Sequence, residues 1–156
     1  MNKVFILFLT FLTCNQIESR LPINNKSISF IKKSANINKL RAAREQKLLN
    51  ISALNDSNNT YKASPLGFLY SIKQTHKNKK SAKKGDLAKI EYKIEDLNSQ
   101  LLYNEEELGT VSFLVDQEDV IPALREGVKY LSEGNSGIFL FPSHLCYGYQ
   151  GDREKI

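Results

Sequence analysis

Cysteine and histidine, two residue types that often carry catalysis or bind metals, are few in this chain. The 156 residues contain two cysteines, Cys14 and Cys146, and two histidines, His76 and His144. No CxxC or HExxH pattern occurs among them, so the sequence does not support a zinc site. GxGxxG, GxxxxGKS and GxxxxGKT are also absent, so no phosphate-binding loop is expected. We therefore predict a function that needs neither a metal nor a cofactor.

Composition indicates a soluble protein with a folded core, because 41% of the residues are hydrophobic and 25% are charged. The formal net charge is +5, and part of the excess lies in a lysine-rich stretch at residues 73–84. We interpret this stretch as a long solvated loop, with contact to anionic lipid headgroups as the alternative. No aromatic residues alternate with its lysines, so we do not expect nucleic-acid binding.

The first residues are typical of an export signal. Lys3 precedes an apolar run at residues 4–13, which is too short to span a membrane, and Cys14 follows. Residues 1–13 resemble a bacterial lipoprotein signal, with Cys14 as the lipidated residue, although Phe11 and Thr13 depart from the usual pattern. We expect an extracytoplasmic protein, lipid-anchored in the bacterial cell envelope and facing the periplasm or the surface. Simple cleavage of the leader, an uncleaved anchor or a cytoplasmic protein are the alternatives.

Residues 14–60 are predicted to be a linker that contains an amphipathic helix at about 27–51. Apolar residues recur at spacings that fit a loose helical stripe: Ile28, Ile31, Ala35, Leu40, Ala43, Leu48 and Ile51. The helix could bind a protein partner or dimerise, or it could be a spacer that holds the following domain away from a membrane. The polar run at residues 55–59 is a natural boundary.

From residue 61 onward the pattern indicates a domain with both strands and a helix. Alternating apolar residues predict strands at residues 64–72, 87–92, 101–103, 111–115 and 136–141. Residues 120–131 are predicted to be a short helix, because Asp119 precedes it and Pro122 stands near its first position. A loop is expected at residues 144–151.

This order, with its motifs, resembles the FKBP family of prolyl isomerases over about residues 65–156. The matching segments are Lys84-Gly85-Asp86, Glu91-Tyr92, Asp119 to Gly127, Phe141-Pro142 and Tyr147-Gly148-Tyr149-Gln150-Gly151. A Val-Ile-Pro helix start followed about 25 residues later by Tyr-Gly-x-x-Gly is specific as a pair. The leader and the charged spacer further resemble the gliding-motility-associated FKBP-type lipoproteins of Bacteroidota.

The resemblance implies an α+β fold, in which an antiparallel sheet wraps around one short helix and an N-terminal helix precedes it. It also implies an apolar hollow as the active site, with Tyr92, Val120, Ile121 and Tyr147 as the catalytic residues. The substrate pocket would be completed by Leu102, Val111, Leu124 and Ile156. Plain core packing is the alternative for the aliphatic residues. By the same resemblance, a backbone N–H near Ile121 and the Tyr147 hydroxyl would hold substrate carbonyls.

The chain also departs from the family pattern. The usual Phe-Asp is replaced by Leu102-Tyr103, the usual Trp by Leu124, and a further aromatic by Val111, so a smaller or looser pocket is expected. We interpret Cys146 as a small buried hydrophobe rather than a redox site. The family's last strand is missing after Ile156, so we expect residues 61–156 to be a C-terminally truncated isomerase domain.

Three functions are compatible with these residues. The first is a peptidyl-prolyl cis-trans isomerase (rotamase) that acts on proline-containing segments of exported or surface proteins, including gliding-motility proteins. The second is a module that binds such segments without catalysis. The third is a structural accessory lipoprotein that acts through helix 27–51.

Overall fold

The computed structural model describes residues 25–74 and 80–156, with side chains from residue 29 onward. The predicted leader, Cys14 and His76 lie outside the described residues. Residues 36–156 form one compact unit, whereas the helical residues before Asn36 belong to another. Within the described ranges, no helix is long and apolar enough to span a bilayer.

The predicted N-terminal helix is present and is longer than expected. Helix α1 runs from Asn25 to Asn55, a stretch without glycine or proline, and both residue types are unfavourable inside helices. It ends at the predicted polar boundary. There the Asp56 carboxylate accepts hydrogen bonds from the Asn58 backbone N–H, the Asn59 amide and the Tyr61 hydroxyl, at 3.1, 2.9 and 2.8 Å. These local bonds stabilise a turn where the helix could otherwise continue.

The face of α1 that meets the rest of the chain is not the predicted apolar stripe. Leu40 and Leu48, two members of that stripe, stay 63% and 45% exposed. The buried residue is Leu49, at 2% exposure, and the residues at four-residue steps before it, Arg41 and Glu45, also make contacts. The stripe was a poor guide because most contacts on this face are polar, and apolar periodicity does not detect polar contacts.

All strand pairings are antiparallel, which confirms the predicted α+β class. In the described ranges, the strands form three separate sheets. The largest has the order β1-β2-β7, from Lys62–Ala63, Leu69–Lys73 and Ser136–Leu140. The second pairs β3 (Leu87–Ile90) with β6 (Val111–Leu114), and the third pairs β4 (Ile94–Glu95) with β5 (Leu101–Tyr103).

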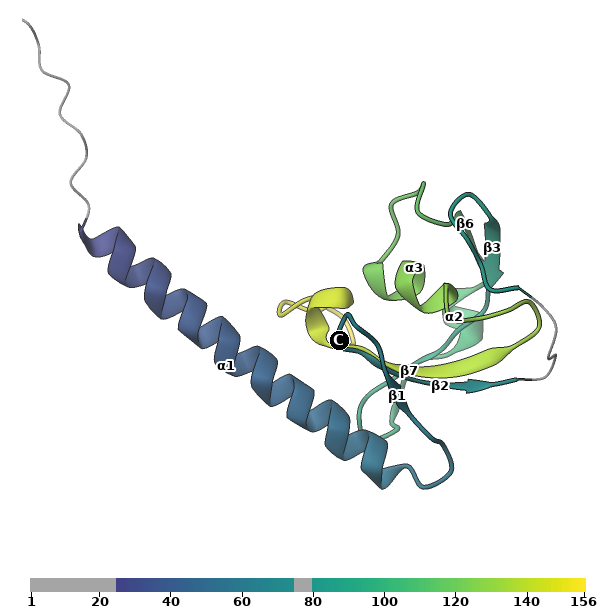
Figure 1. The fold of residues 1–156 in the computed structure, drawn as a ribbon, viewed down its shortest axis with the longest axis horizontal. Coiled ribbons are helices and arrows are strands. Elements are labelled where there is room, and N and C mark those ends of the chain that lie inside the picture. The colour runs from purple at the N-terminus through teal and green to yellow at the C-terminus, as the bar shows by residue number, and fades with distance from the viewer. Residues whose placement is uncertain (1–24, 75–79) are drawn as a thin grey trace, which may run out of the picture. The chain divides into compact units, whose positions relative to one another are not determined.

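Helix α3 (Pro122–Val128) lies over one face of the β2–β7 ladder (Figure 1). It is shorter than the predicted helix and begins at Pro122, where a missing N–H costs nothing. Gly127 allows the close approach: a methyl group there would lie 3.3 Å from the Phe141 ring. The main core lies on the other side of the helix, where Val128 packs with buried residues of β3 and β6, Ala88 and Phe113 among them.

A second cluster, made of aromatic rings, joins α3 to the β2–β7 ladder. Phe68 is fully buried, and its ring centre lies 4.8 Å from that of Phe141 and 5.4 Å from that of Tyr130. Tyr70 and Phe139 complete the cluster: the ring centre of Tyr70 lies 4.5 Å from that of Tyr130 and 6.4 Å from that of Phe139. The Tyr130 hydroxyl shares a 3.0 Å hydrogen bond with Ser64, so its polar end is satisfied. The cluster fixes α3 at its C-terminal end.

Two short helices were not predicted. Helix α2 (Glu105–Leu108) is started by a capping box, in which Asn104 and Glu107 each bond the other's backbone N–H. The Asn-x-x-Glu spacing was a readable signal for it. The 3-10 helix η1 (Ser143–Leu145) follows β7 and introduces the loop that was expected at residues 144–151.

Candidate functional site

An open hollow of about 500 Å³ lies at the N-terminal end of α3. Its walls come from the segment before β4, from β6, from the start of α3 and from the loop after η1. The lining residues are Tyr92, Val111, Asp119, Val120, Ile121, Pro122, Leu124 and Cys146. Apolar side chains dominate this set, so the hollow suits an apolar ligand with few polar contacts.

The start of α3 forms one wall through local backbone geometry. Ile121 is the N-cap residue, with φ −50° and ψ 128°, and its carbonyl accepts hydrogen bonds from the backbone N–H groups of Leu124 and Arg125 at 2.9 and 3.2 Å. Pro122 then begins the helix and fixes its direction. Among the described residues, no hydrogen-bond partner satisfies the Ile121 backbone N–H. This donor is therefore available to a ligand in the hollow.

The floor of the hollow is continuous with the core. Val111, Val120 and Leu124 line the hollow and also pack against the cluster of buried residues around Phe113. The sequence left core packing and pocket lining as alternatives for these aliphatic residues. The structure gives them both roles, because their side chains form the boundary between the core and the hollow.

Tyr92 and Tyr147 bring two hydroxyl groups to this region. Tyr92 lines the hollow just after β3, and burial raises the pKa of its hydroxyl. Tyr147 is not among the lining residues; burial is the main reason that its pKa is raised, and nearby Tyr92 adds to the effect. Both groups stay protonated at neutral pH. Five of the eight predicted site residues thus line the hollow, and Tyr147 lies near it.

The other two predicted pocket residues are placed elsewhere. Leu102 is half-buried in β5, and Ile156 is 39% exposed; neither lines the hollow. The Ile156 backbone N–H bonds the Asp152 carboxylate at 2.9 Å, which holds this residue in a turn. Neighbouring Tyr103 donates a short hydrogen bond to the same carboxylate. These bonds direct residues 152–156 to β5 rather than into the hollow.

The pair Tyr103–Asp152 is a feature that sequence reasoning missed. The hydrogen bond from Tyr103 lowers the pKa of Asp152 to about 2, and the same bond raises the pKa of Tyr103 to about 12. Lys155 joins them: its ammonium lies 4.4 Å from the centre of the Tyr103 ring and 2.6 Å from the Glu107 carboxylate. By the resemblance to the FKBP family, Tyr103 occupies the position of the usual aspartate. Asp152, from another part of the chain, brings a carboxylate to the same region.

The residues around the hollow match a known protein family. The sequence model of the FKBP-type peptidyl-prolyl cis-trans isomerases matches residues 78–156, which include every residue that lines the hollow. The chain belongs to this family. The resemblance predicted from the sequence is therefore confirmed at the level of the family. The residues of the matched Val-Ile-Pro motif line the hollow.

Two known proteins are similar to the chain. The chain is 32% identical over 96 residues to the "Probable FKBP-type peptidyl-prolyl cis-trans isomerase FkpA" of Neisseria meningitidis serogroup B. That match covers 61% of this chain and 34% of the relative, so the chain spans about a third of the relative's length. The crystal structure of FkpA from Escherichia coli aligns with a TM-score of 0.57 at 23% identity, over 89% of this chain and 68% of that one. This second match shows the shared fold.

Cys146, Asp119 and Pro122 line the hollow of the FKBP domain but were not among the predicted site residues. Burial raises the pKa of the Cys146 thiol to about 11, so it is protonated at neutral pH and is a weak nucleophile. Asp119 is exposed and is the one charged residue among those that line the hollow. Cys146 directly precedes the Tyr-Gly-x-x-Gly motif and Asp119 directly precedes Val-Ile-Pro, so position next to a motif was the available signal.

The arrangement contains an apolar surface, a free backbone donor and hydroxyl groups, without a nucleophile activated by a base. In the described part of the chain, no group of three or more His, Cys, Asp or Glu residues could hold a metal ion. Such a site can bind an uncharged segment and remove water from it. Chemistry that needs only a change of conformation fits this arrangement best.

Proposed function

We propose that this chain is a peptidyl-prolyl cis-trans isomerase whose hollow at the start of α3 binds an X-Pro segment. The single observation that carries the proposal is the free N–H of Ile121 at the edge of an apolar hollow that the family's own motif forms. A proline ring fits an apolar hollow, and a substrate carbonyl can accept the free N–H.

The reaction requires no covalent chemistry. Rotation about an X-Pro bond meets a barrier of roughly 18–20 kcal/mol, which arises from amide resonance. Water stabilises the planar, dipolar amide more than the twisted one. An apolar hollow withdraws that stabilisation, and a donor placed for the twisted geometry lowers the barrier further.

Each residue of the site has a proposed role. Ile121 supplies the backbone donor, and Val120 with the Ile121 side chain contacts the proline ring. Tyr92 closes one side of the hollow, and the Tyr147 hydroxyl bonds a substrate carbonyl as the segment enters. Leu124 and Val111 form the floor. Leu102 and Ile156 do not line the hollow, so they would contact only a substrate that extends beyond it. Their role in substrate binding stays a prediction from the family.

We further propose that the clients are exported or surface polypeptides. The support is the leader at residues 1–13 and the cysteine that follows it, which together suit a lipid anchor at Cys14. An envelope location, with the FKBP domain held outside the cytoplasm, follows from this anchor. Gliding-motility proteins are the narrower proposal, supported by the combination of leader, charged spacer and FKBP domain.

The direct test is the rate of cis-to-trans isomerisation of a short Leu-Pro peptide, followed by exchange NMR so that no coupling protease is needed. We expect the full chain to accelerate the exchange in proportion to its concentration. A mixture of the peptide with the Tyr147→Phe variant controls for contaminating isomerases, because a contaminant would be equally active in both samples. Peptide binding without acceleration would overturn the enzyme proposal.

A non-catalytic binding module is the second candidate, and the aliphatic floor of the hollow favours it. Leu124 and Val111 provide less surface than the aromatic rings that the family usually has there, so the amide is desolvated less completely. This candidate predicts saturable peptide shifts in NMR together with an unchanged exchange rate. The same sample therefore separates the two functions.

A role for α1 in binding a protein partner is a third candidate. The helix leaves large apolar side chains in solvent, with Phe30 at 70% and Ile31 at 63% exposure. Exposed apolar side chains on a helix are suited to contact with another protein. Deletion of residues 15–35 should abolish capture of a partner and leave peptide isomerisation intact if this role is separate from the FKBP domain.

A further inference from the structure

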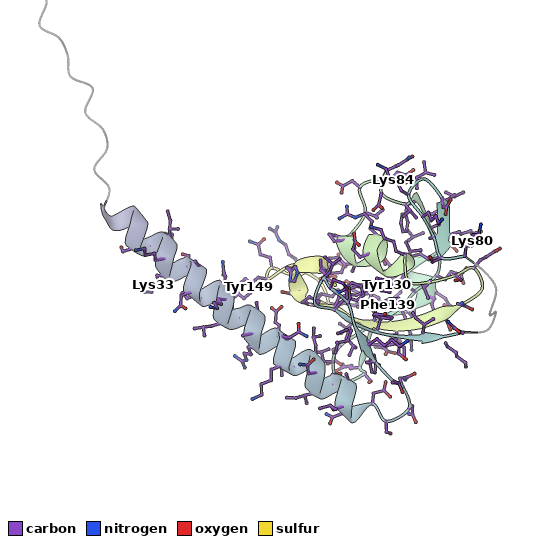
Figure 2. All side chains as sticks on the ribbon, in the orientation of Figure 1. Lys33, Lys80, Lys84, Tyr130, Phe139 and Tyr149 are labelled. Atoms are coloured by element: carbon purple, nitrogen blue, oxygen red, sulfur yellow. The ribbon has the colours of Figure 1, made fainter. Side chains whose placement is uncertain are left out.

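Helix α1 holds the loop that follows β7 at two points. The Glu45 carboxylate accepts two hydrogen bonds from Ser143, one from its hydroxyl at 2.8 Å and one from its backbone N–H at 3.2 Å. One helical turn earlier, the Arg41 guanidinium lies 4.3 Å from the centre of the Tyr149 ring, which Figure 2 shows beside the helix. Residues four apart share one face of a helix, so a single face of α1 contacts both ends of residues 143–149.

The segment between these two points contributes one residue to the lining of the hollow and places another close to it. Cys146 lines it and Tyr147 lies near Tyr92. Their backbone path depends on Ser143, whose carbonyl accepts the N–H of Cys146 at 3.0 Å and that of Gly148 at 2.8 Å. Ser143 is thus the common point of the loop's internal hydrogen bonds and of its attachment to Glu45.

We propose that Glu45 is a positioning residue: by holding Ser143, it keeps Cys146 and Tyr147 in the geometry in which the hollow binds an X-Pro segment. The inference rests on the proposed function and adds to it that α1 is part of the binding apparatus. Hydrogen bonds to an ionised carboxylate are stronger than neutral ones, so Glu45 is suited to fix a short loop.

Helix α1 also has contacts that do not involve Glu45. Leu49 is buried on the same face, and the Ser52 hydroxyl donates a 3.1 Å hydrogen bond to the Leu97 carbonyl. Removal of the Glu45 carboxylate should therefore loosen the loop and leave the helix in place. This separation makes the proposal testable.

The test compares the full chain with Glu45→Ala and Glu45→Gln, and uses Lys47→Ala, an exposed position on the same helix, as the matched control. The first measurement is amide hydrogen exchange of Cys146 and Gly148, which does not depend on any activity. The second is the Kd for a short Leu-Pro peptide, and the third is the isomerisation rate of that peptide. Thermal melting checks the fold of each variant.

We expect Glu45→Ala to raise the exchange rates of both amides by about tenfold and to weaken peptide binding by about three- to tenfold. Glu45→Gln keeps one acceptor oxygen and should give intermediate values, whereas Lys47→Ala should match the wild type. If Glu45→Ala fails to fold, Glu45→Gln and Ser143→Ala decide by the same measurements, because each removes a single hydrogen bond.

Unchanged amide exchange in Glu45→Ala would overturn the proposal, because the loop would then be held without Glu45. Faster exchange with unchanged peptide binding would also overturn it, because the contact would be structural only. A wild-type chain that binds the peptide but does not accelerate its isomerisation refutes the proposed enzyme. In that case amide exchange and Kd still decide the role of Glu45.

Discussion

Leu49 provides a sharp test of whether α1 is part of the folded unit, because its neighbour Leu48 is a matched control. The two leucines are adjacent on one helix, yet Leu49 is 2% exposed and Leu48 is 45% exposed. Replacement of either by alanine removes the same three carbon atoms. Alanine is at least as favourable in a helix as leucine, so helix propensity does not contribute to the difference.

The expected losses follow from burial. Three buried carbon groups contribute roughly 2.4 kcal/mol of transfer free energy, and a residual cavity brings the cost of Leu49→Ala to about 3 kcal/mol. Leu48 is already half in solvent and leaves no closed cavity, so Leu48→Ala should lower the free energy of unfolding by about 1 kcal/mol or less. The difference between the variants should be about 2 kcal/mol.

Urea denaturation of the full chain, followed by circular dichroism, measures both losses. The dependence of the free energy of unfolding on urea concentration should be the same in both variants. The difference in stability should therefore appear as a difference in the urea concentration at the midpoint of unfolding. Equal losses in the two variants would show that Leu49 stabilises the unit no more than a half-exposed leucine does. In that case α1 would be a spacer that folds independently, and the positioning role of Glu45 would lose its basis.

Three further predictions concern the hollow and its surroundings. Tyr147→Phe removes one hydroxyl and should lower kcat/KM for a Leu-Pro peptide by about three- to tenfold, with no change in the melting temperature; an unchanged kcat/KM would exclude the hydroxyl as a substrate donor. The bond between Tyr103 and Asp152 should make the turn at residues 152–156 sensitive to acid. Because the pKa of Asp152 is lowered from 3.8 to about 2, its stabilisation is complete above pH 3.8 and is lost as the pH falls toward about 2. Amide chemical shifts should follow this transition in the wild type and not in Asp152→Asn, and identical titrations would contradict the assignment. Cys146 has a pKa raised from 9.0 to about 11, so iodoacetamide should label it about 100-fold more slowly than an ordinary thiol near neutral pH. Mass spectrometry of the Cys146 peptide measures the rate, and a saturating Leu-Pro peptide should slow it further; labelling as fast as free cysteine would refute the buried thiol.

The aliphatic floor of the hollow links the affinity for a ligand to the stability of the domain. Val111 and Leu124 are shared between the hollow and the core, so a larger side chain there would alter both. Substitution of Leu124 by an aromatic residue would fill part of the hollow and also press on the core around Phe113. Affinity and stability are thus linked at the floor, whereas Ile121 at the helix start can be changed with less effect on the core.

Local patterns in the sequence were sufficient for much of the FKBP domain. The alternation of Ala88 and Ile90 with charged Lys89 and Glu91 predicted β3, and Pro122 marked the start of α3. The two matched motifs identified the family, and through it they predicted Val120 and Ile121, which line the hollow. These features are readable because each depends on residues close together in the chain, through side-chain alternation, helix capping and short motifs.

Tertiary structure alone decided which residues far apart in the sequence meet. The pairing of Tyr103 with Asp152, the contact of Glu45 with Ser143 and the burial of Leu49 rather than Leu48 all depend on how separate elements pack. A polar contact across 98 residues leaves no periodic signal in either segment, because each partner alone resembles an ordinary surface residue. The sequence therefore determined the family and the motif that lines the hollow, while packing determined what surrounds and supports it.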